Sequence, residues 1–319
     1  MKQVYLTEPI HEDAIGLLRS HFRVVLGYTL QDDRERAAVL GESHGVLIRS
    51  ARVTEEVMEQ APALQVIAKH GIGVDNIDVA AATARGIQVV NAPLANVNAV
   101  AEHTVALLFA AAKHLAFLDA RTRRGGFSQR NQYLKMELAG KTIGLVGFGR
   151  IARLIARKLS GLEMTVLTND PFCDLEAAKA LGVSPVSREE LLQRSDFVSL
   201  HTPLIPETRK MANWDFFRQM KPTAYLINTS RGGVVDEPAL IRALQEGEIA
   251  GAALDVYEQE PPPADHSFFS MEQVVLSPHN AALTDRAMLA MAMDSAQGIC
   301  DYLEGRAPQY PVNRPENPR

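Results

Sequence analysis

Residues 141–161 read KTIGLVGFGRIARLIARKLSG, in which an apolar segment runs directly into a glycine-containing turn and then into a basic, amphipathic segment. Consecutive apolar residues before the turn predict a strand that is covered on both faces, and the segment after it has helical periodicity. Gly147 permits a tight turn, Gly149 lets the backbone come close to a bound group, and Ala152 lets the helix pack closely on the strand. The segment therefore predicts a strand–helix unit of a doubly wound α/β domain.

The helix that begins after this turn and the strand that follows it indicate a dinucleotide site. Free N–H groups at Arg150 and Ile151, together with the positive end of the helix dipole, can bind phosphates. Asp170 ends the next predicted strand, where an acidic side chain accepts hydrogen bonds from the ribose hydroxyls of adenosine. Its carboxylate would repel the 2′-phosphate of NADP, and the sequence NDPF at 169–172 offers no arginine, so we expect NAD. Alternatively, Asp170 only caps the next helix.

The same alternation of strands and helices extends in both directions from this motif. The strand-like runs before it are QVYLT (3–7), FRVVLGY (22–28), GVLIRS (45–50), LQVIAKHG (64–71) and IQVVNAP (87–93). The runs after it are MTVLTND (164–170), DFVSLHTP (196–203), AYLINTS (224–230), IAGAALDV (249–256) and VVLSPH (274–279). Strand–helix–strand units at this spacing imply right-handed crossovers and parallel sheets.

Two long predicted helices, near residues 97–119 and 284–304, could join the two series of strands. The second helix follows the last strand and should carry the chain back to the first series, which makes that domain discontinuous. We therefore expect an α/β protein with two doubly wound parallel-sheet domains. They are a flavodoxin-like domain of residues 1–97 and 285–319, and a Rossmann domain of residues 98–284.

The composition sets limits on partners, location and metal binding. Of the 319 residues, 46% are hydrophobic and 22% are charged, which suits two globular cores. A net charge of −5 argues against a nucleic acid or an anionic membrane as the main partner. The start of the sequence shows no secretory signal and no apolar run reaches about 20 residues, so we expect a cytoplasmic protein. With only Cys173 and Cys300 and no H-E-x-x-H motif, we expect no metal site.

Six further blocks along the chain carry recognisable motifs. In order they are AKHGIGVDNID (68–78), NAPLANVNAVAEHT (91–104), HTPLIPET (201–208), INTSRGGVVDEPAL (227–240), GAALDVYEQEPP (251–262) and VVLSPHNAA (274–282). These blocks resemble the D-isomer-specific 2-hydroxyacid dehydrogenases over nearly the whole chain. The resemblance implies an NAD-dependent oxidoreductase that moves a hydride between nicotinamide and C2 of a small 2-hydroxy acid. It also implies that the discontinuous domain binds the substrate and that the Rossmann domain binds NAD.

By motif, the catalytic arginine, acid and histidine of this family fall on Arg231, Glu260 and His279. Reduction of a 2-keto acid needs a proton on its oxygen, and a histidine is suited to supply it. A carboxylate on the other imidazole nitrogen favours the protonated ring, which is the role expected for Glu260. Arg231 offers a planar fork that can bind the substrate carboxylate and polarise the carbonyl group. Each of the three alone could instead be structural, and His103 and His201 are rival histidines.

The resemblance also implies contacts with the cofactor, the substrate and a second copy of the chain. Asp255 is expected to reach the carboxamide of the nicotinamide. The expected cofactor-binding residues are Thr104, Gly147, Gly149, Arg150, Ile151, Asp170, Thr202, Thr229, Ser230 and Asp255. The expected substrate-binding residues are Arg49 and, through their backbone amides, Gly71, Ile72, Gly73 and Val74. The family generally dimerises through its nucleotide domain, so we expect a homodimer in which residues 121–135 form a partner-facing arm.

The sequence leaves the identity of the substrate open. A phosphorylated acid such as 3-phosphoglycerate would need extra cations, for which Arg49, Arg52 and Lys69 are available. LIRSARVT (47–54) also resembles D-3-phosphoglycerate dehydrogenases. However, Lys69-His70 departs from the Arg-Ala usual there, and the chain is shorter than the enzymes that carry a regulatory C-terminal region. Glyoxylate, hydroxypyruvate and simple 2-keto acids are the alternatives.

Two other functions are compatible with parts of this pattern. Formate dehydrogenases resemble this fold, but they carry glutamine where Glu260 stands, which disfavours that activity. A non-catalytic NAD(H)-sensing binding protein, like the corepressors that share this architecture, could keep the same arginine, acid and histidine. The sequence contains no long polar extension and no basic patch, which disfavours this second class.

Overall fold

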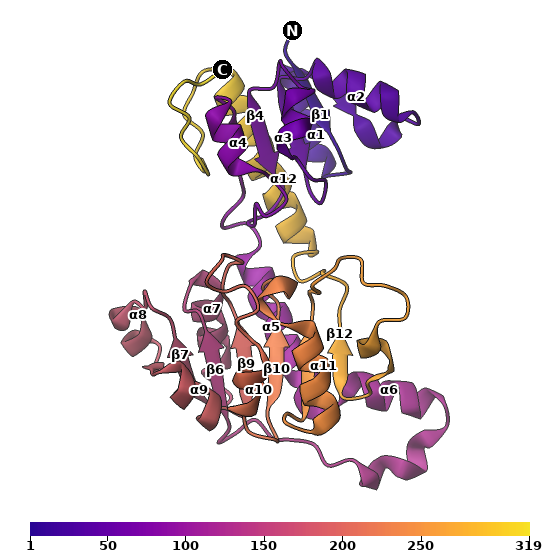
Figure 1. Cartoon of the computed structure of the whole chain (residues 1–319), viewed down its shortest axis with the longest axis vertical. Coiled ribbons are helices and arrows are strands. Elements are labelled where there is room, and N and C mark those ends of the chain that lie inside the picture. The colour runs from indigo at the N-terminus through magenta and orange to yellow at the C-terminus, as the bar shows by residue number, and fades with distance from the viewer. The chain divides into compact units, whose positions relative to one another are not determined.

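The computed structural model describes residues 1–319, apart from the side chain of Gln129. The chain divides into two compact units, Met1–Asn96 with Ala282–Arg319, and Val97–Ala281. The first unit holds a sheet of five strands and the second a sheet of seven, and all strand pairings within them are parallel (Figure 1). The predicted fold class, two doubly wound α/β domains, is therefore confirmed.

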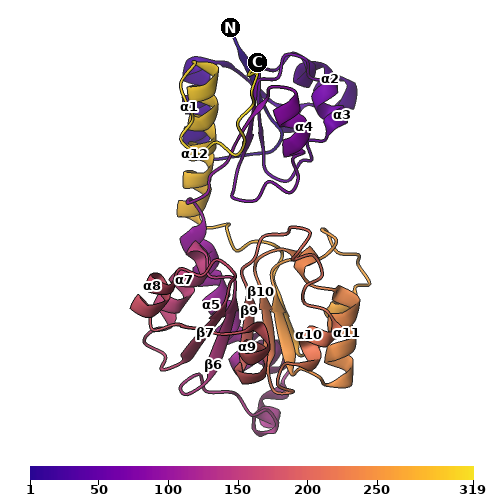
Figure 2. The same cartoon turned by 60° about the vertical axis from the view of Figure 1, so that its left-hand side comes forward.

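The sheet of the first unit has the order β2-β1-β3-β4-β5, which is the flavodoxin-like order. Its strands are β1 (Gln3–Leu6), β2 (Arg23–Leu26), β3 (Gly45–Ile48), β4 (Val66–Lys69) and β5 (Gln88–Val90). The helices are α1 (Glu12–His21), η1 (Gly27–Thr29), α2 (Asp33–Gly41), α3 (Glu55–Glu59), α4 (Val79–Ala84) and α12 (Asp285–Leu303). Helices α1 and α12 lie on one face of the sheet and α2, α3 and α4 on the other (Figure 2). All residues of β1 and β3 are buried, as expected for strands covered on both faces.

The sheet of the second unit has the order β12-β11-β10-β9-β6-β7-β8. Its strands are β6 (Thr142–Val146), β7 (Thr165–Asn169), β8 (Ser184–Pro185), β9 (Phe197–Leu200), β10 (Tyr225–Asn228), β11 (Gly251–Leu254) and β12 (Val274–Leu276). From β6 the chain adds β7 and β8 toward one edge of the sheet and then β9 to β12 toward the other, so the strand order reverses at β6. This is Rossmann topology with one added strand. In such sheets, ligands bind beyond the carboxyl ends of the strands, next to this reversal.

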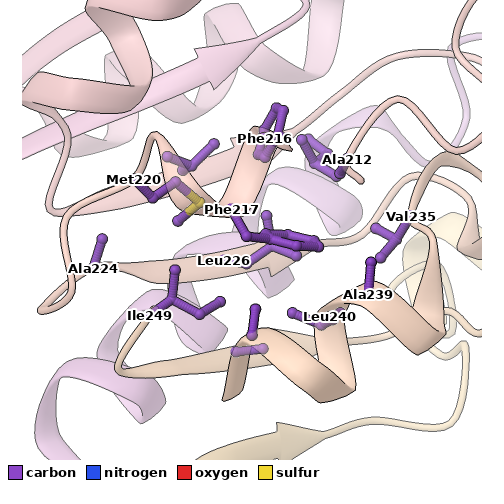
Figure 3. Packing of buried hydrophobic residues seen from close by; sticks show 14 of the residues in the cluster. Ala212, Phe216, Phe217, Met220, Ala224, Leu226, Val235, Ala239, Leu240 and Ile249 are labelled. Carbon is purple, nitrogen blue, oxygen red and sulfur yellow. The ribbon is translucent and has the colours of Figure 1, made fainter. Parts of the chain in front are cut away.

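Helices lie on both faces of the seven-stranded sheet. The helices of this unit are α5 (Val97–Lys113), α6 (Leu115–Arg123), η2 (Gly126–Gln132), α7 (Arg150–Leu159), α8 (Leu175–Ala180), α9 (Arg188–Arg194), α10 (Trp214–Arg218), η3 (Gly232–Val234), α11 (Glu237–Glu246) and η4 (Ser267–Ser270). On one face, α10 and α11 pack Phe217 and Leu240 near Leu226 of β10, and all three side chains are fully buried (Figure 3). On the other face, α5 packs against α7, where Ile155 and Leu145 are fully buried. The sheet is therefore packed on both faces, and it holds the loops that leave the carboxyl ends of its strands.

The helix predicted near residues 97–119 is interrupted. His114 has a left-handed φ of 52°, and α5 and α6 are bent there by 60°. Over the described residues, no single helix is long and apolar enough to cross a bilayer, although α5 and α6 as a bent pair meet the criteria of length and composition. Nine of the 17 residues of α5 are buried, and five of these belong to the core of the second unit, so packing accounts for much of its apolar composition.

The chain after α12 lies along the outer edge of the first sheet, beside β5. The amide of Val312 donates to the carbonyl oxygen of Val89 at 2.8 Å. The side chain of Asn313, which is 8% exposed, accepts from the Val89 amide at 2.6 Å and donates to the Ile87 carbonyl at 2.9 Å. These bonds cover a sheet edge that would otherwise present unpaired backbone groups.

Candidate active site

The turn after β6 has a geometry that requires its small residues. Gly147 has a φ of 91°, and a Cβ atom there would lie 2.7 Å from the carbonyl oxygen of His201. Gly149 is the N-cap of α7, and a Cβ atom there would meet nothing within 4 Å. Ala152 is fully buried in the core beneath the helix. The amides at the start of α7, from Arg150 onward, therefore open onto free space in which an anion can bind.

The carboxylate of Asp170 joins the glycine turn to the loop after β7. Its Oδ2 accepts a hydrogen bond from the Phe148 amide at 2.6 Å, and its Oδ1 accepts one from the Phe172 amide at 2.7 Å. Each oxygen can accept one further bond. The next helix, α8, is capped by Asp174, whose side chain accepts from the Ala177 amide at 3.0 Å. Asp170 is therefore not the cap of that helix, and its half-buried carboxylate fits a partner with hydroxyl groups.

Several hydroxyl groups lie at the carboxyl ends of β9 and β10. The hydroxyl of Thr202 is buried and has no hydrogen-bond partner among the described residues, so a bound group that supplies one fits this position. The hydroxyls of Thr104 and Thr229 lie 2.8 Å apart, and Thr104 also donates to the carbonyl oxygen of Val100 at 2.8 Å. The hydroxyl of Ser230 donates to Oδ1 of Asn228, the last residue of β10, at 2.8 Å.

Asp255, at the end of β11, holds the turn that carries His279. Its Oδ1 accepts from the amide of Asn280 at 3.0 Å and its Oδ2 from the amide of Ala281 at 3.0 Å. Burial opposes ionisation of Asp255, but hydrogen bonds from His103, from Ser277 and from these amides lower its pKa. The two amides directly follow His279, whose φ of 52° lies in the left-handed region. Asp255 therefore fixes a backbone conformation that few side chains adopt unaided.

Glu260 and His279 are joined by a short hydrogen bond. Oε2 of Glu260 lies 2.6 Å from Nδ1 of His279, and Oε1 accepts from the amide of Tyr257 at 3.0 Å. Burial would raise the pKa of Glu260, but the bond and charge of His279, the Tyr257 amide and the charge of Arg231 lower it. With Nδ1 bonded to the carboxylate, Nε2 is the ring nitrogen placed to exchange a proton with another molecule.

Arg231 follows β10, in a loop that contacts the loop of Glu260. Its Nη1 donates to the carbonyl oxygen of Ser230 at 2.7 Å, and its own carbonyl accepts from the side chain of Asn228 at 3.0 Å. At the next residue, Gly232, a Cβ atom would overlap the carbonyl of Tyr257. The two loops therefore meet backbone to backbone, and the charge of Arg231 acts on the Glu260 carboxylate. The structure thus brings all three predicted catalytic side chains to one edge of one sheet.

The two rival histidines have other partners. Burial lowers the pKa of His201 to about 3, and its Nε2 lies 2.9 Å from the hydroxyl of Ser199. Such a ring is neutral at physiological pH, which makes it a poor proton donor. Nε2 of His103 lies 3.0 Å from the hydroxyl of Ser277 and 3.4 Å from Oδ1 of Asp255. Both rings therefore support neighbouring groups, and His279 is better placed for proton transfer.

In the first unit, the expected substrate-binding residues follow two neighbouring strands. Residues 71–74 follow β4, and their first residue, a glycine, has a φ of 141°. The carbonyl of Ile72 accepts from the side chain of Asn91 at 2.7 Å, which fixes this loop. Arg49 follows β3, and its Nη1 donates to the carbonyl oxygen of Pro9 at 3.2 Å.

Two charged side chains of the first unit, Lys69 and Glu8, form hydrogen bonds with loops of the same unit. Nζ of Lys69 donates to Oδ1 of Asn76 at 2.8 Å and to the carbonyl oxygen of Arg49. The carboxylate of Glu8 accepts from the three successive amides of residues 49–51 at 2.7–2.9 Å. Burial alone would raise the pKa of Glu8, but its hydrogen bonds lower it to about 2. Both side chains therefore brace the loop that carries Arg49.

Sequence reasoning did not single out the side chains that hold these loops in place. Glu8, Glu237, His266 and Ser277 all bond to residues distant in sequence. Glu237 lies inside the quoted block INTSRGGVVDEPAL, so the motif marked its segment but gave no indication of its partners. Such contacts depend on how the strands are ordered, which spacing along the chain does not specify.

Comparison with known proteins places this arrangement in one family. Residues 105–281 match the family described as D-isomer specific 2-hydroxyacid dehydrogenase, NAD binding domain. The chain is 41% identical, over 98% of its length, to D-3-phosphoglycerate dehydrogenase 2, chloroplastic, of Arabidopsis thaliana, of which it covers 50%. It is also 41% identical over 98% of its length to the glyoxylate reductase of Pyrococcus furiosus, of which it covers 95%.

A solved structure agrees with this placement. The 2-hydroxyacid dehydrogenase of Ketogulonicigenium vulgare Y25 superimposes with a TM-score of 0.87 at 28% identity, covering 99% of this chain and 100% of that one. The chain spans 50–61% of the length of four phosphoglycerate dehydrogenase relatives. The chain belongs to the D-isomer specific 2-hydroxyacid dehydrogenase family, and its residues 105–281 form the NAD-binding domain of that family.

Proposed function

We propose that this chain is an oxidoreductase that transfers a hydride between NAD(H) and C2 of a small D-2-hydroxy acid or 2-keto acid. One observation carries the proposal: Nδ1 of His279 lies 2.6 Å from the carboxylate of Glu260, on which the charge of Arg231 also acts. An imidazole paired with a carboxylate beside a guanidinium is suited to proton transfer at a carbonyl oxygen. Relatives named glyoxylate reductase and D-3-phosphoglycerate dehydrogenase support the same class of reaction.

The residues around the glycine turn fit NAD, which supplies or accepts the hydride when it is bound. The amides of Arg150 and Ile151 at the start of α7 would hold its phosphates, next to the space left open by Gly149. Asp170 would accept bonds from the adenosine ribose and would repel a 2′-phosphate. The buried hydroxyl of Thr202 would gain the partner that it otherwise lacks among the described residues.

The three side chains at the carboxyl edge would divide the proton chemistry between them. In the direction of reduction, His279 would hold a proton on Nε2 and transfer it to the carbonyl oxygen of the substrate. Glu260, bonded to Nδ1, would stabilise the charged form of the ring and fix its orientation. Arg231 would bind the substrate carboxylate and polarise the carbonyl group. A positioned acid of this kind contributes about 10²–10⁴-fold to the rate.

We favour an unphosphorylated substrate, whose carboxylate would be bound by backbone amides of residues 71–74 and by Arg49. Of the three cations available for a phosphate, Lys69 already donates to Asn76 and to the backbone of Arg49. D-3-Phosphoglycerate is the second candidate, since relatives of that activity by name are 37–41% identical to this chain. Arg49 and Arg52 would then have to bind the phosphate.

We also propose that the active form is a cytoplasmic homodimer built through the second unit. The arm at 121–135 exposes large apolar side chains, including Phe127 at 65% and Leu134 at 91%, and an apolar contact with a second copy would bury them. The side chain of Gln129, within this arm, lies outside the described residues. Mass measurement by light scattering on the purified protein tests this, and a monomeric mass would contradict it.

The central test is NADH oxidation with a panel of 2-keto acids that includes glyoxylate, hydroxypyruvate and 3-phosphohydroxypyruvate. We expect turnover with at least one acid, and a higher kcat/KM for an unphosphorylated one. A higher kcat/KM for 3-phosphohydroxypyruvate would instead favour the phosphoglycerate activity. Tight NADH binding without turnover of any acid would overturn the enzyme proposal in favour of an NAD(H)-sensing protein.

A further inference from the structure

The loop between β11 and β12, which carries Glu260, is held from outside by a second carboxylate. Glu237 lies in the first turn of α11. Its Oε1 accepts from the amide of Glu258 at 2.6 Å, and its Oε2 accepts from Nε2 of His266 at 3.2 Å. The two donors lie on either side of Glu260 in the sequence. One carboxylate therefore fixes both ends of the segment that presents Glu260.

Both side chains of this outer pair are withdrawn from solvent. Glu237 is 12% exposed and His266 is 11% exposed at the side chain. The ring of His266 lies among aromatic rings, with centroid distances of 6.4 Å to Tyr257, 4.8 Å to Phe268 and 5.8 Å to Phe269. A carboxylate buried to this extent needs donors on both oxygens, because an unsatisfied one has a large desolvation penalty. The pair is therefore a specific, mutually dependent contact and not a surface ion pair.

The geometry defines which nitrogen of His266 carries the hydrogen. Nδ1 accepts from the backbone amide of Phe268 at 3.3 Å, where His266 caps the short helix η4. A nitrogen that accepts an N–H has no hydrogen of its own. Nε2 therefore donates to Glu237, and each nitrogen of the ring has a separate task.

The segment between the two anchors carries Glu260, and its first residue, Glu258, also pairs through its side chain with Lys210 at 3.0 Å. Between the two anchors, Glu260 and its neighbours Glu258 and Gln259 are exposed, and three prolines follow at 261–263. The carboxylate of Glu260 accepts from the Tyr257 amide and bonds to His279, and the charge of Arg231 also acts on it. An exposed segment with few internal contacts keeps its position through its fixed ends.

We propose that Glu237, acting through the Glu258 amide and the His266 ring, is the positioning residue that keeps Glu260 within hydrogen-bonding distance of His279. This inference rests on the proposed function, because it assigns a role within the same proton-transfer site. Glu237 does not touch substrate or cofactor in this scheme; it acts through Glu260.

Four variants separate the two tasks of the His266 ring and the two tasks of Glu237. E237A removes the bonds of Glu237 to the Glu258 amide and to His266. E237Q keeps an acceptor for the Glu258 amide, but its side-chain N–H then faces the N–H of His266, and the two donors cannot bond to each other. H266Q places an amide N–H near the position of Nε2 and so keeps the donor to Glu237. H266N places its side-chain oxygen near the position of Nδ1 and so keeps only the cap of Phe268.

We expect E237A and H266N to lower kcat by about 10- to 100-fold, the effect of a misplacement of about 1 Å at a reacting group. H266Q should have a kcat much closer to that of the wild type than H266N has. The Kd for NADH should be unchanged in all four, since no cofactor contact is altered. E246Q, an exposed glutamate on the same helix that pairs with Arg242, is the matched control and should behave as wild type.

A readout without turnover keeps this inference separate from the proposed function. In protein with ¹³C-labelled carboxyl groups, the titration of Glu260 should move toward that of an ordinary glutamate in E237A and H266N but not in H266Q, because the bond to His279 is loosened. If no 2-keto acid is reduced but this pattern appears, the proposed function fails and the positioning role stands. If kcat and the Glu260 titration are unchanged in E237A and H266N, or if H266N outperforms H266Q, Glu237 only stabilises the fold and the inference is wrong.

Discussion

Oε2 of Glu260 and Nδ1 of His279 lie 2.6 Å apart, although 19 positions and the whole of strand β12 separate the two residues along the chain. Parallel strands bring this about, because the loops after β11 and β12 emerge at the same edge of the sheet. The position of each partner is fixed separately, that of His279 by Asp255 and that of Glu260 by its loop.

Replacing the imidazole should abolish proton transfer without disturbing the cofactor site. H279Q is expected to lower kcat by about 10²–10⁴-fold, because the group that supplies the proton is lost. The Kd for NADH, followed by fluorescence titration, should stay at the wild-type value. A variant with near-normal kcat would remove His279 from the mechanism.

The pH dependence of the pair has a definite sign. Burial opposes ionisation of Glu260, but His279, the Tyr257 amide and Arg231 lower its pKa. A carboxylate with a lowered pKa contributes its interaction fully above the ordinary glutamate pKa and loses it as the pH falls through the lowered value. The activity that depends on this bond should therefore persist below the usual glutamate range.

E260Q is the matching variant for this pH effect. The amide cannot titrate, so the acidic limb of kcat/KM that belongs to Glu260 should disappear. Loss of a charge-assisted hydrogen bond should lower kcat/KM by about 10- to 100-fold at neutral pH. An acidic limb of unchanged midpoint in E260Q would assign that limb to another group.

The two glycines of the turn after β6 should respond differently to alanine. At Gly147 the added Cβ would lie 2.7 Å from a backbone oxygen and the φ of 91° is unfavourable, so G147A should lower the free energy of unfolding by more than about 1 kcal/mol. At Gly149 the Cβ meets nothing within 4 Å, so G149A should fold normally and bind NADH more weakly. Denaturant unfolding and NADH titration of both variants test this, and weakened folding in G149A alone would contradict it.

Asp170 should determine the choice between the two nicotinamide cofactors. The wild-type protein is expected to have a higher kcat/KM with NADH than with NADPH, because the carboxylate repels a 2′-phosphate. D170N keeps one acceptor oxygen and removes the charge, so its preference for NADH should fall by about tenfold or more. Equal or better use of NADPH by the wild type would show that the cofactor assignment is wrong.

Glu8 should make the first unit sensitive to acid. Its carboxylate accepts three successive amides, and hydrogen bonds outweigh burial to lower its pKa to about 2. The stability it contributes is therefore complete above the ordinary glutamate pKa and is lost as the pH falls toward 2. E8A should lower the unfolding free energy by about 2 kcal/mol at pH 7. Its deficit relative to wild type should shrink below pH 4, and a deficit independent of pH would contradict the assignment.

Local sequence patterns predicted the parts of the fold that depend on neighbouring residues. The apolar run before Gly147, the glycines themselves and Asp170 were enough to identify the strand, turn and helix of the second unit. The helix near residues 97–119 was only partly predicted, because its composition is helical throughout and the left-handed residue at His114 gives no compositional signal.

Contacts between distant residues were the part that sequence could not supply. Arg231, Glu260 and His279 were selected by resemblance, and spacing alone would not have paired them. Lys69 was considered as one of three cations available for a phosphate, and in the structure it donates to Asn76 and to the backbone of Arg49. A lysine at the end of a strand can bind a ligand or nearby backbone, and the course of the neighbouring loop decides between them.

Gly232 has a consequence for attempts to redesign this protein. A methyl group there would overlap the carbonyl of Tyr257, so the loops of Arg231 and Glu260 touch with no side chain between them. Neither loop can be shifted without displacing the other, so a substitution that moves the Arg231 loop should also change the distance between Glu260 and His279. Redesign of either loop therefore has to preserve this junction, or Arg231 and Glu260 lose their positions together.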